Sequence, residues 1–241
     1  MNSEKPSTTQ LAIITGASAG IGAAAAANFL NLNYTVYALA RRTCPVPGVL
    51  SLACDLSDSE SIELALDQIL SNIDGPTEIA LIHNASQMQK DSTEACEDTA
   101  LREVLETNVV AINHLNRRLI PHMSSGSSIL YVGSTLSEKA VAGSFSYVVS
   151  KHAQLGIMRA TCQDLMGRGI HTALICPGFT DTEMLRTHIK GDLAVLESIG
   201  SMNAFNRLVR PEEIAQGLVF CHVNPAINGS VFHLNLGQKE S

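Results

Sequence analysis

The sequence predicts an α/β protein with a single doubly wound parallel sheet of about seven strands and helices on both faces. Seven short aliphatic or β-branched segments alternate with helical segments through almost all of the 241 residues. Only 16% of the residues are charged and 45% are hydrophobic, so a large share of the chain must be buried, as in a sheet covered on both sides. No internal repeat or Pro/Gly-rich linker divides the chain, which predicts one domain over residues 1–241.

Each expected strand is a short run of β-branched or aliphatic residues. The runs are 11–15, 34–39, 49–53, 78–82, 128–132, 171–175 and 230–235. Segments with the length and apolar spacing of helices separate them, at 21–31, 58–71, 95–123, 147–168 and 211–222. Ser57 with Glu60 is typical of a capping box at the second helix. Because parallel neighbours cannot be joined by a tight turn, this alternation predicts right-handed crossovers.

One connection interrupts the alternation of strands and helices. Residues 179–209, between the sixth and seventh strands, form a segment that is too long for an ordinary connection. Long connections of this kind usually cover or bind a substrate. We therefore expect a lid or substrate loop, with a purely structural helix pair as the alternative.

Charge and composition exclude several classes of partner. The chain has 16 Lys+Arg against 23 Asp+Glu, a net charge of −7, so it lacks the basic surface that nucleic-acid phosphates require. No apolar run reaches the roughly 18–20 residues of a membrane span, and the polar start MNSEKPSTTQ is unlike a signal peptide. The six cysteines show no C-x-x-C pair, which indicates neither a metal site nor disulfides. These features predict a cytoplasmic protein without nucleic-acid, membrane or metal partners.

A glycine-rich turn follows the first expected strand. Residues 16–22 read G-A-S-A-G-I-G and lead directly into an alanine-rich helix. Glycines let the backbone approach a pyrophosphate closely, and the free N–H groups at the helix start attract the anion. The spacing differs from the usual dinucleotide fingerprint G-x-G-x-x-G, so a bare helix-start turn is the alternative. The residues expected at this phosphate site are Gly16, Ser18, Gly20, Ile21 and Gly22.

The same turn also fits the pattern G-x-S-x-G, the nucleophile elbow of a serine hydrolase, with Ser18 as the nucleophile. Such hydrolases take one oxyanion-hole N–H from a loop on an earlier strand. Only a short polar segment precedes the first strand here, so the hydrolase is a remote alternative.

Arg41 and Arg42 follow the second expected strand, where a dinucleotide fold meets the adenosine ribose. NAD binding normally uses an Asp or Glu at this place, and no carboxylate occurs between Glu4 and Asp55. Guanidinium groups suit a 2′-phosphate instead, at about 1.5–3 kcal/mol for each charge-assisted contact. The arginines predict NADP(H) as the cofactor, with two solvated surface arginines as the alternative.

A serine, a tyrosine and a lysine have the spacing of a catalytic group. Ser134 lies just past the fifth expected strand, and Tyr147 and Lys151 begin the next helix four residues apart, on one helix face. An ammonium beside a phenol, whose pKa is normally near 10, favours the phenolate. The positive charge of an oxidised nicotinamide acts in the same direction, and Ser134 can hydrogen-bond the substrate oxygen. Since a Tyr-x-x-x-Lys pair is common by chance, an ordinary helix surface is the alternative.

These motifs, in this order, make the chain resemble the single-domain branch of the short-chain dehydrogenase/reductase family over nearly its whole length. The matching residues are Thr15 to Gly22 (T-G-x-x-x-G-I-G), Asp55, Asn84-Ala85, Asn108, Ser134, Tyr147 to Lys151 (Y-V-V-S-K), Pro177-Gly178 and Thr182. The resemblance implies a Rossmann-type fold, NADP(H) binding, a small-molecule substrate and a homo-oligomer, either a dimer or a tetramer.

The resemblance also implies catalytic roles. Tyr147 is the general acid/base, Lys151 lowers its pKa and holds the nicotinamide ribose, and Ser134 positions the carbonyl. Asn108 completes a proton relay through water. Independently, an asparagine inside a helix is unusual because its side chain competes for backbone hydrogen bonds. A water-binding kink fits this observation, and a tolerated surface asparagine is the alternative.

Cofactor contacts are implied in the same way. Asp55 contacts the adenine, Asn84 supports the cofactor loop, and Thr182 lies with Pro177 and Gly178 near the nicotinamide carboxamide. Each residue also has a structural alternative: Asp55 precedes a helix cap, Asn84 fills a turn, and Thr182 caps a lid helix.

Two positions depart from the family pattern. Ser86 follows Asn84-Ala85 where the family has glycine. If that position needs a positive φ, Ser86 is strained; otherwise its hydroxyl narrows or decorates the site. The chain also reads Asn235-Leu236-Gly237 where the family often shows Asp-Gly-Gly, which weakens the prediction of a carboxyl-terminal oligomer contact.

The sequence therefore predicts an NADP-dependent oxidoreductase that transfers a hydride between nicotinamide and a ketone, aldehyde or secondary alcohol. A catalytically idle NADP-binding protein, acting as a redox sensor or as the partner of another chain, is the alternative. The complete set of Ser134, Tyr147 and Lys151 favours the enzyme. Apolar residues such as Met184 and Phe205 suggest an apolar substrate of moderate size, or packing of the lid, and do not distinguish substrate classes.

Overall fold

A computed structural model describes residues 10–238; residues 1–9, which include most of the polar amino-terminal segment and Glu4, and residues 239–241 lie outside the described part. Seven strands form one sheet in the order β3-β2-β1-β4-β5-β6-β7, and every neighbouring pair is parallel. The predicted fold class is confirmed.

The seven strands lie within about two residues of the predicted runs. They are β1 (Gln10–Thr15), β2 (Thr35–Ala40), β3 (Leu50–Ala53), β4 (Glu78–His83), β5 (Ser128–Val132), β6 (His171–Pro177) and β7 (Ser230–Leu234). The α-helices are α1 (Gly20–Asn31), α2 (Ser59–Leu70), α3 (Asp98–Leu105), α4 (Ala111–Leu119), α5 (Phe145–Asp164), α6 (Glu183–His188), α7 (Leu193–Gly200) and α8 (Pro211–Val223). Shorter turns are the π-helical η1 (Glu106–Val110) and the 3₁₀ segments η2 (Ile120–His122), η3 (Thr135–Ser137) and η4 (Pro225–Ile227).

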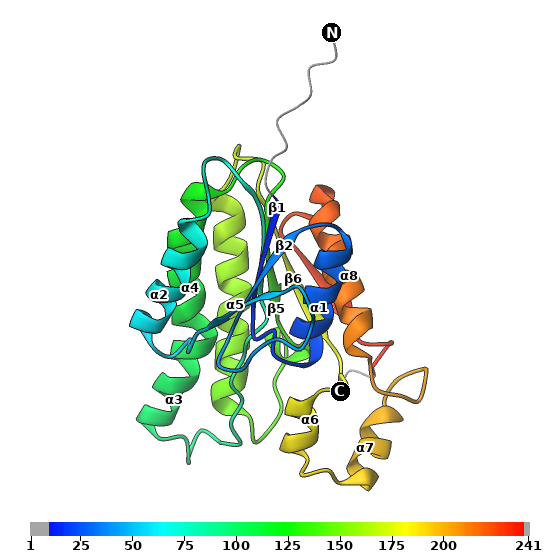
Figure 1. Cartoon of the computed structure of the whole chain (residues 1–241). Helices are drawn as coiled ribbons and strands as arrows, with labels where there is room; N and C mark the ends of the chain where they lie inside the picture. The colour runs from blue at the N-terminus through cyan, green and yellow to red at the C-terminus, as the bar shows by residue number, and fades with distance from the viewer. Residues whose placement is uncertain (1–9, 239–241) are drawn as a thin grey trace.

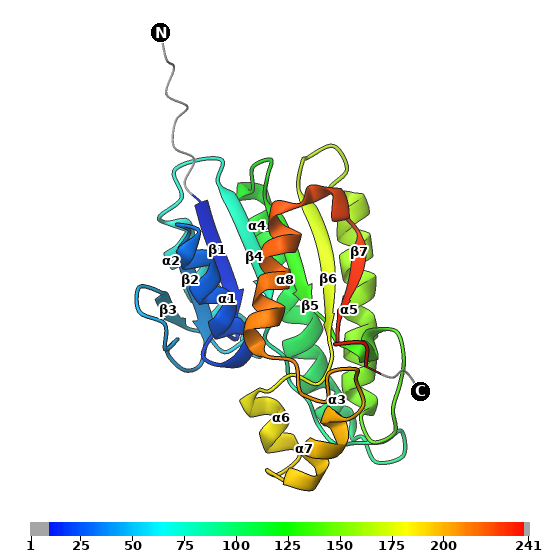
Figure 2. The same cartoon turned by 90° about the vertical axis from the view of Figure 1, so that its right-hand side faces the viewer.

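Helices α2, α4 and α5 cover one face of the sheet, and α1 and α8 cover the other (Figures 1 and 2). Successive side chains of a strand point to opposite faces. In β1, Leu11 and Ile13 therefore pack against α2 and α4, while Ala12 and Ile14 pack against α1 and α8. Burial of each large aliphatic side chain stabilises the fold by roughly 1.5–3 kcal/mol, so both helical layers are held to the sheet.

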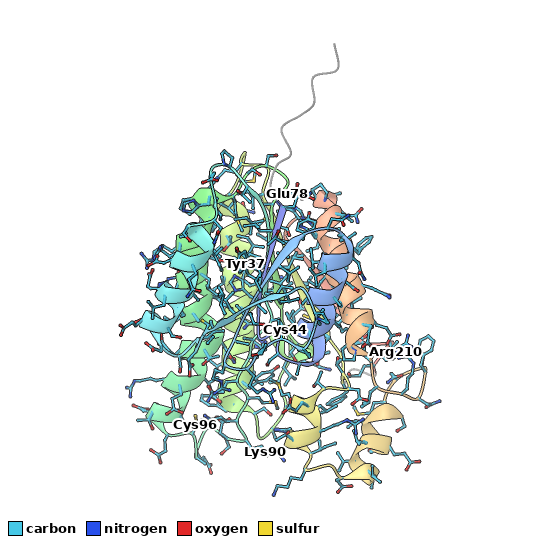
Figure 3. The ribbon with its side chains drawn as sticks, in the orientation of Figure 1. Tyr37, Cys44, Glu78, Lys90, Cys96 and Arg210 are labelled. Carbon is cyan, nitrogen blue, oxygen red and sulfur yellow. The ribbon has the colours of Figure 1, made fainter. Side chains whose placement is uncertain are left out.

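The chain reverses its direction of winding between β1 and β4, which are neighbours in the sheet. In open parallel sheets a crevice forms at this switch point, outside the carboxyl ends of the strands. Figure 3 marks the two edges of the sheet: Lys90, after β4, lies near α6, whereas Glu78 lies at the opposite edge. The candidate functional residues after β1, β2, β4, β5 and β6 consequently share one edge.

The capping box predicted for Ser57 is wrong. Helix α2 has Asp58 as its N-cap, and the Asp58 carboxylate accepts a 3.0 Å hydrogen bond from the Glu60 N–H group. Ser57 instead donates its N–H and O–H groups to Asp55, at 3.0 and 2.7 Å. Aspartate caps a helix as well as serine does, and Asp58 is the residue next to the first helical turn.

The long helix predicted over 95–123 is interrupted. It consists of α3, η1, α4 and η2, and a π-helical turn lies in the middle. A π-helical turn inserts one extra residue into a helical turn and is frequent at functional sites. Here it contains Asn108, which is buried.

Residues 179–209 contain the helices α6 and α7. The segment is tied at its base, because the Val209 N–H group donates to the Phe179 carbonyl and the Asp181 N–H group donates to the Val209 carbonyl, both at 2.9 Å. Beyond this base, Leu193 is 76% exposed and Phe205 is 63% exposed. The segment therefore contains a helix pair whose outer residues are exposed, and its action as a lid stays a prediction. No helix within residues 10–238 has the length and apolarity of a membrane span.

Candidate active site

The glycine turn after β1 needs glycine at specific positions. Gly16 and Gly20 have φ angles of 68° and 54°, which favour glycine. A Cβ atom on Gly16 would lie 2.8 Å from the Cα atom of Ala85, so the turn packs directly on the segment after β4. Helix α1 begins behind the turn with Ala19 as an N-cap that makes no side-chain hydrogen bond. Its first N–H groups are thus available to an anion.

Asn84 supports this turn. Its Nδ2 group donates to the carbonyl oxygens of Thr15 and Gly16, at 2.9 and 3.1 Å. The Thr15 hydroxyl oxygen accepts from the N–H groups of Asn84 and Ala85, at 2.9 and 3.0 Å. A Cβ atom on Gly22 would lie 2.6 Å from Asn84 Nδ2. The ends of β1 and β4 and the start of α1 are therefore joined into one rigid cradle.

Arg41 and Arg42 are exposed after β2. Arg42 binds the Glu183 carboxylate at the start of α6 in a two-contact ion pair, at 2.8 and 3.1 Å. Hydrogen bonds from the Ser57 N–H and O–H groups lower the pKa of Asp55, and the charge of Arg41 adds a smaller lowering. An acidic group from the segment 179–209 thus occupies one of the two arginines predicted to bind a 2′-phosphate.

The base of segment 179–209 touches the glycine turn. A Cβ atom on Gly20 would lie 3.1 Å from the Thr182 methyl carbon. Thr182 is also the N-cap of α6, where its hydroxyl oxygen accepts from the Leu185 N–H group at 3.3 Å. Gly178, after Pro177, has room only for hydrogen, because a Cβ atom would lie 2.8 Å from the Asn235 Cβ. Pro177, Gly178 and Thr182 therefore lie along the same edge as the cradle.

Ser134 follows the end of β5 and caps η3. Its hydroxyl oxygen accepts from the Leu136 N–H group at 3.1 Å, and its own N–H group donates to the Ser137 hydroxyl at 3.1 Å. Because capping uses only the oxygen lone pair, the hydroxyl proton of Ser134 can still be donated, and the hydroxyl lies close enough to Tyr147 to lower the pKa of that phenol.

Tyr147 and Lys151 lie on one face of the first turns of α5. The Lys151 Nζ atom is 5.4 Å from the centroid of the Tyr147 ring. Lys151 is only 1% exposed, and its ammonium donates to the Val132 carbonyl at 2.9 Å and to Gln154 Oε1 at 3.1 Å. Burial lowers the pKa of Lys151 to about 7. The lysine is thus fixed by two oxygen acceptors on one side of the tyrosine.

Tyr147 keeps part of its side chain accessible. Desolvation raises the pKa of its phenol to about 12, and the nearby hydroxyls of Ser134 and Ser86 act in the opposite direction. The phenol is therefore protonated at neutral pH, the form that a proton donor requires.

Asn108 is completely buried at the π-helical turn. Its Oδ1 atom accepts from the Gln87 N–H group at 2.7 Å, and its Nδ2 group donates to the Gln87 carbonyl and the Ser150 hydroxyl, at 2.8 and 2.9 Å. The Asn108 carbonyl oxygen accepts from Gln154 Nε2 at 2.9 Å. The alternative of a surface asparagine is therefore wrong, because the residue connects α5 with the segment after β4.

Ser86 carries no left-handed backbone strain, since it is absent from the described residues with positive φ. Of the two alternatives for Ser86, the structure therefore supports the one in which its hydroxyl lies in the site. Its Oγ atom is buried and makes no hydrogen bond within the described part of the chain, yet it lies close enough to Tyr147 to lower the pKa of the phenol.

Two residues at this edge lie outside the predicted set. Gln154 binds Lys151 and Asn108, and Glu183 binds Arg42. Gln154 lies three residues after Lys151 and therefore on the same helix face. A polar residue at that spacing, between apolar neighbours, was a sequence indication of a role beside Lys151. For Glu183 there was no such indication in the sequence, because its partner Arg42 is 141 residues away.

The sheet order, the glycine cradle at the switch point and the helices on both faces define a Rossmann-like α/β protein. The sequence model described as short chain dehydrogenase matches residues 10–192. The chain belongs to this family of oxidoreductases.

Curated relatives span almost the whole chain. A 3-oxoacyl-[acyl-carrier-protein] reductase of Vibrio harveyi is 27% identical over 240 residues, covering 95% of this chain and 96% of the relative. Carbonyl reductase family member 4 of Danio rerio is 26% identical over 242 residues, covering 95% and 98%. These names describe the relatives, and both are reductases of carbonyl compounds.

Solved structures give the same result for the fold. A double mutant of a Serratia marcescens short-chain dehydrogenase/reductase is 26% identical, covers 97% of this chain and 99% of its own, and has a TM-score of 0.84. A short chain dehydrogenase of Burkholderia cenocepacia in complex with NADP is 23% identical, with coverage of 95% and 98% and a TM-score of 0.84. A 4-hydroxyisoleucine dehydrogenase complexed with NADH is 25% identical, with coverage of 95% and 97% and a TM-score of 0.80. Nicotinamide nucleotides of both kinds therefore occur among the structural neighbours.

Proposed function

We propose that the chain is a single-domain NADP(H)-dependent oxidoreductase acting on ketones or aldehydes, or on the corresponding alcohols, with Tyr147 as the general acid/base. One observation carries the proposal: the protonated phenol of Tyr147 lies close to the Ser134 hydroxyl, and the Lys151 Nζ atom lies 5.4 Å from its ring centroid, at the edge that holds the glycine cradle. This arrangement supports proton transfer to an oxygen that gains negative charge.

The residues present fit a nicotinamide dinucleotide. The uncapped start of α1 behind Gly16 and Gly20 suits a pyrophosphate. Arg41 and Arg42 suit a 2′-phosphate better than a free ribose hydroxyl, because both are cationic and no carboxylate follows β2 directly. When bound, the cofactor supplies or accepts the hydride.

The protein's own part in carbonyl reduction is then the handling of one proton. Ser134 donates a hydrogen bond to the carbonyl oxygen and fixes its position. As the carbonyl carbon gains a hydride, the oxygen becomes basic and takes the phenol proton of Tyr147, which leaves a phenolate beside Lys151. The Lys151 ammonium stabilises this phenolate. In alcohol oxidation the same proton returns to Tyr147.

The alternatives are less well supported. No imidazole or carboxylate hydrogen-bonds Ser18 among the residues described, so a serine nucleophile would have no base there. A catalytically idle NADP-binding protein would not require Ser134, Tyr147 and Lys151 to lie together at this edge, and turnover distinguishes the two functions. We also propose a homo-oligomer, which light scattering on the purified protein tests.

The experiment that tests the proposal is Tyr147→Phe, measured by oxidation of NADPH with a panel of ketones and aldehydes. General acid catalysis is typically worth about 10²–10⁴ in rate, so turnover should fall by that factor. NADPH affinity should hardly change, because the ring remains. The matched control is Tyr131→Phe, which removes a buried hydroxyl from β5 that is hydrogen-bonded to Asn116 at 3.0 Å. The proposal is wrong if Tyr147→Phe keeps near-full activity, or if the panel shows no turnover.

A further inference from the structure

Gln154 forms a bridge inside the candidate site that the proposed chemistry does not yet use. Its Nε2 group donates to the Asn108 carbonyl oxygen at 2.9 Å, and its Oε1 atom accepts from the Lys151 ammonium at 3.1 Å. Gln154 and Lys151 are each 1% exposed, and Asn108 is completely buried. One side-chain amide therefore connects the π-helical turn to the lysine beside Tyr147.

The polarity of this bridge is fixed. An amide presents its oxygen only as an acceptor and its NH₂ group only as a donor. The ammonium of Lys151 and the carbonyl of Asn108 demand that orientation and no other. A hydrogen bond accepted from the charged form of a lysine favours that charged form. Gln154 thus opposes the burial that lowers the pKa of Lys151.

The Gln154 amide lies between Asn108 and Lys151, the two groups that a relay water would connect. A relay needs a group that donates on one side and accepts on the other, and that can exchange these roles, as water does. The Gln154 amide joins the same two partners but cannot exchange roles without becoming its imidic acid tautomer. It therefore holds both partners without passing a proton between them.

We propose that Gln154 is a positioning residue, which stands in for the relay water expected at Asn108 and favours the ammonium form of Lys151 beside Tyr147. The inference rests on the proposed function. A proton that leaves Tyr147 is accordingly not replaced through Asn108. The phenolate takes its new proton from solvent water, with release of hydroxide, once the product has left and opened the site.

The test compares Gln154→Leu with Gln154→Ala. Leucine fills the space and offers no polar atom. Alanine leaves space for a water, which would find a donor and an acceptor in Lys151 and Asn108. If the hydrogen bonds matter, the leucine variant should lose about ten- to hundredfold in kcat/KM for carbonyl reduction, and the alanine variant should lose clearly less. If Gln154 only fills space, the order is reversed, because alanine leaves a cavity.

A second readout needs neither cofactor nor turnover. The pKa of Lys151 can be followed by NMR of its Nζ nitrogen in the cofactor-free protein. It should start near 7, fall by about one unit in Gln154→Leu, and stay close to the wild-type value in Gln154→Ala. Gln163→Leu, an exposed position on the same helix, is the control and should leave both readouts unchanged.

The possible results separate this inference from the proposed function. If Tyr147→Phe is inactive while both Gln154 variants match the wild type in kcat/KM and in the pKa of Lys151, only the role of Gln154 is refuted. If Tyr147→Phe is fully active, the proposed function itself fails. Should Gln154→Leu not fold, Gln154→Glu keeps an acceptor for Lys151 and adds negative charge. It must then raise the pKa of Lys151, and an unchanged pKa overturns the proposal.

Discussion

Two buried histidines should make the fold sensitive to mild acid. His83 is 2% exposed, and its Nε2 group lies 2.8 Å from Asn116 Oδ1, while its Nδ1 atom is buried and has no hydrogen-bond partner among residues 10–238. Protonation would therefore place an N–H group where none of these residues accepts it. Burial lowers the pKa of His83 from 6.5 to about 4.

His222 behaves similarly at the opposite edge of the sheet. Its ring nitrogens contact the Tyr34 hydroxyl at 2.6 Å and the Ser128 hydroxyl at 2.7 Å. Burial lowers its pKa to about 4; Glu78 acts against this shift, and His171 adds to it. In the unfolded chain both imidazoles return to a pKa near 6.5.

The sign and size of the effect follow from these values. Below pH 6.5 the unfolded state binds more protons than the folded state, so the free energy of unfolding falls as the pH falls, until about pH 4. At pH 5 each histidine costs roughly 2 kcal/mol, and both together about 4 kcal/mol. Typical domains have only about 5–15 kcal/mol in total, so the loss should be large.

Urea denaturation between pH 8 and pH 5 measures this loss. We expect the free energy of unfolding to decline mainly below pH 6.5, and His83→Gln or His222→Gln each to remove about 2 kcal/mol of the decline at pH 5. His171, which is also buried and whose pKa burial also lowers, contributes to the remainder. Most carboxylates are not protonated in this window, which assigns the slope to histidines. A stability that stays flat from pH 8 to pH 5, or a slope unchanged in the double variant, would refute the reasoning.

Four further predictions concern ligands. Glu183→Gln releases Arg42, so NADPH should bind a few-fold more tightly and NADH equally well; fluorescence titration checks this, and an equal gain for both cofactors would contradict it. Arg41→Asp should reduce the preference for NADPH over NADH by about tenfold or more, as compared dissociation constants will show. Higher ionic strength should weaken NADPH binding more than NADH binding, because exposed charges are screened; parallel salt dependences would argue against a 2′-phosphate site. Ser86→Gly removes a hydroxyl that lowers the pKa of Tyr147, so the acid limb of alcohol oxidation should move to higher pH, and an unmoved limb would show that Ser86 has no such effect.

The elements of the fold were largely predictable from sequence because they depend on local patterns. The aliphatic run of β1 indicates a buried strand directly, and the glycines before α1 indicate a tight turn at its start. The site was predictable as far as its motifs reach. The Arg42 ion pair with Glu183 was not, since it depends on how distant segments meet in space. For Gln154 the helix spacing to Lys151 could be read from the sequence, but its contact with Asn108, 46 residues away, could not. The predicted capping box at Ser57 failed for a different reason. Ser57 and the N-cap Asp58 are neighbours, and serine and aspartate are equally good helix caps.

The cradle formed by Asn84 and the glycine turn has a consequence for folding kinetics. Asn84 hydrogen-bonds Thr15 and Gly16, so the turn acquires its final shape only after β4 has docked beside β1, about seventy residues later in the chain. Such non-local pairing is slow and is completed late in parallel sheets. A cofactor that binds only the completed cradle stabilises contacts absent from the folding transition state. It should therefore retard unfolding and leave the refolding rate almost unchanged, which makes the bound protein kinetically persistent rather than faster to assemble.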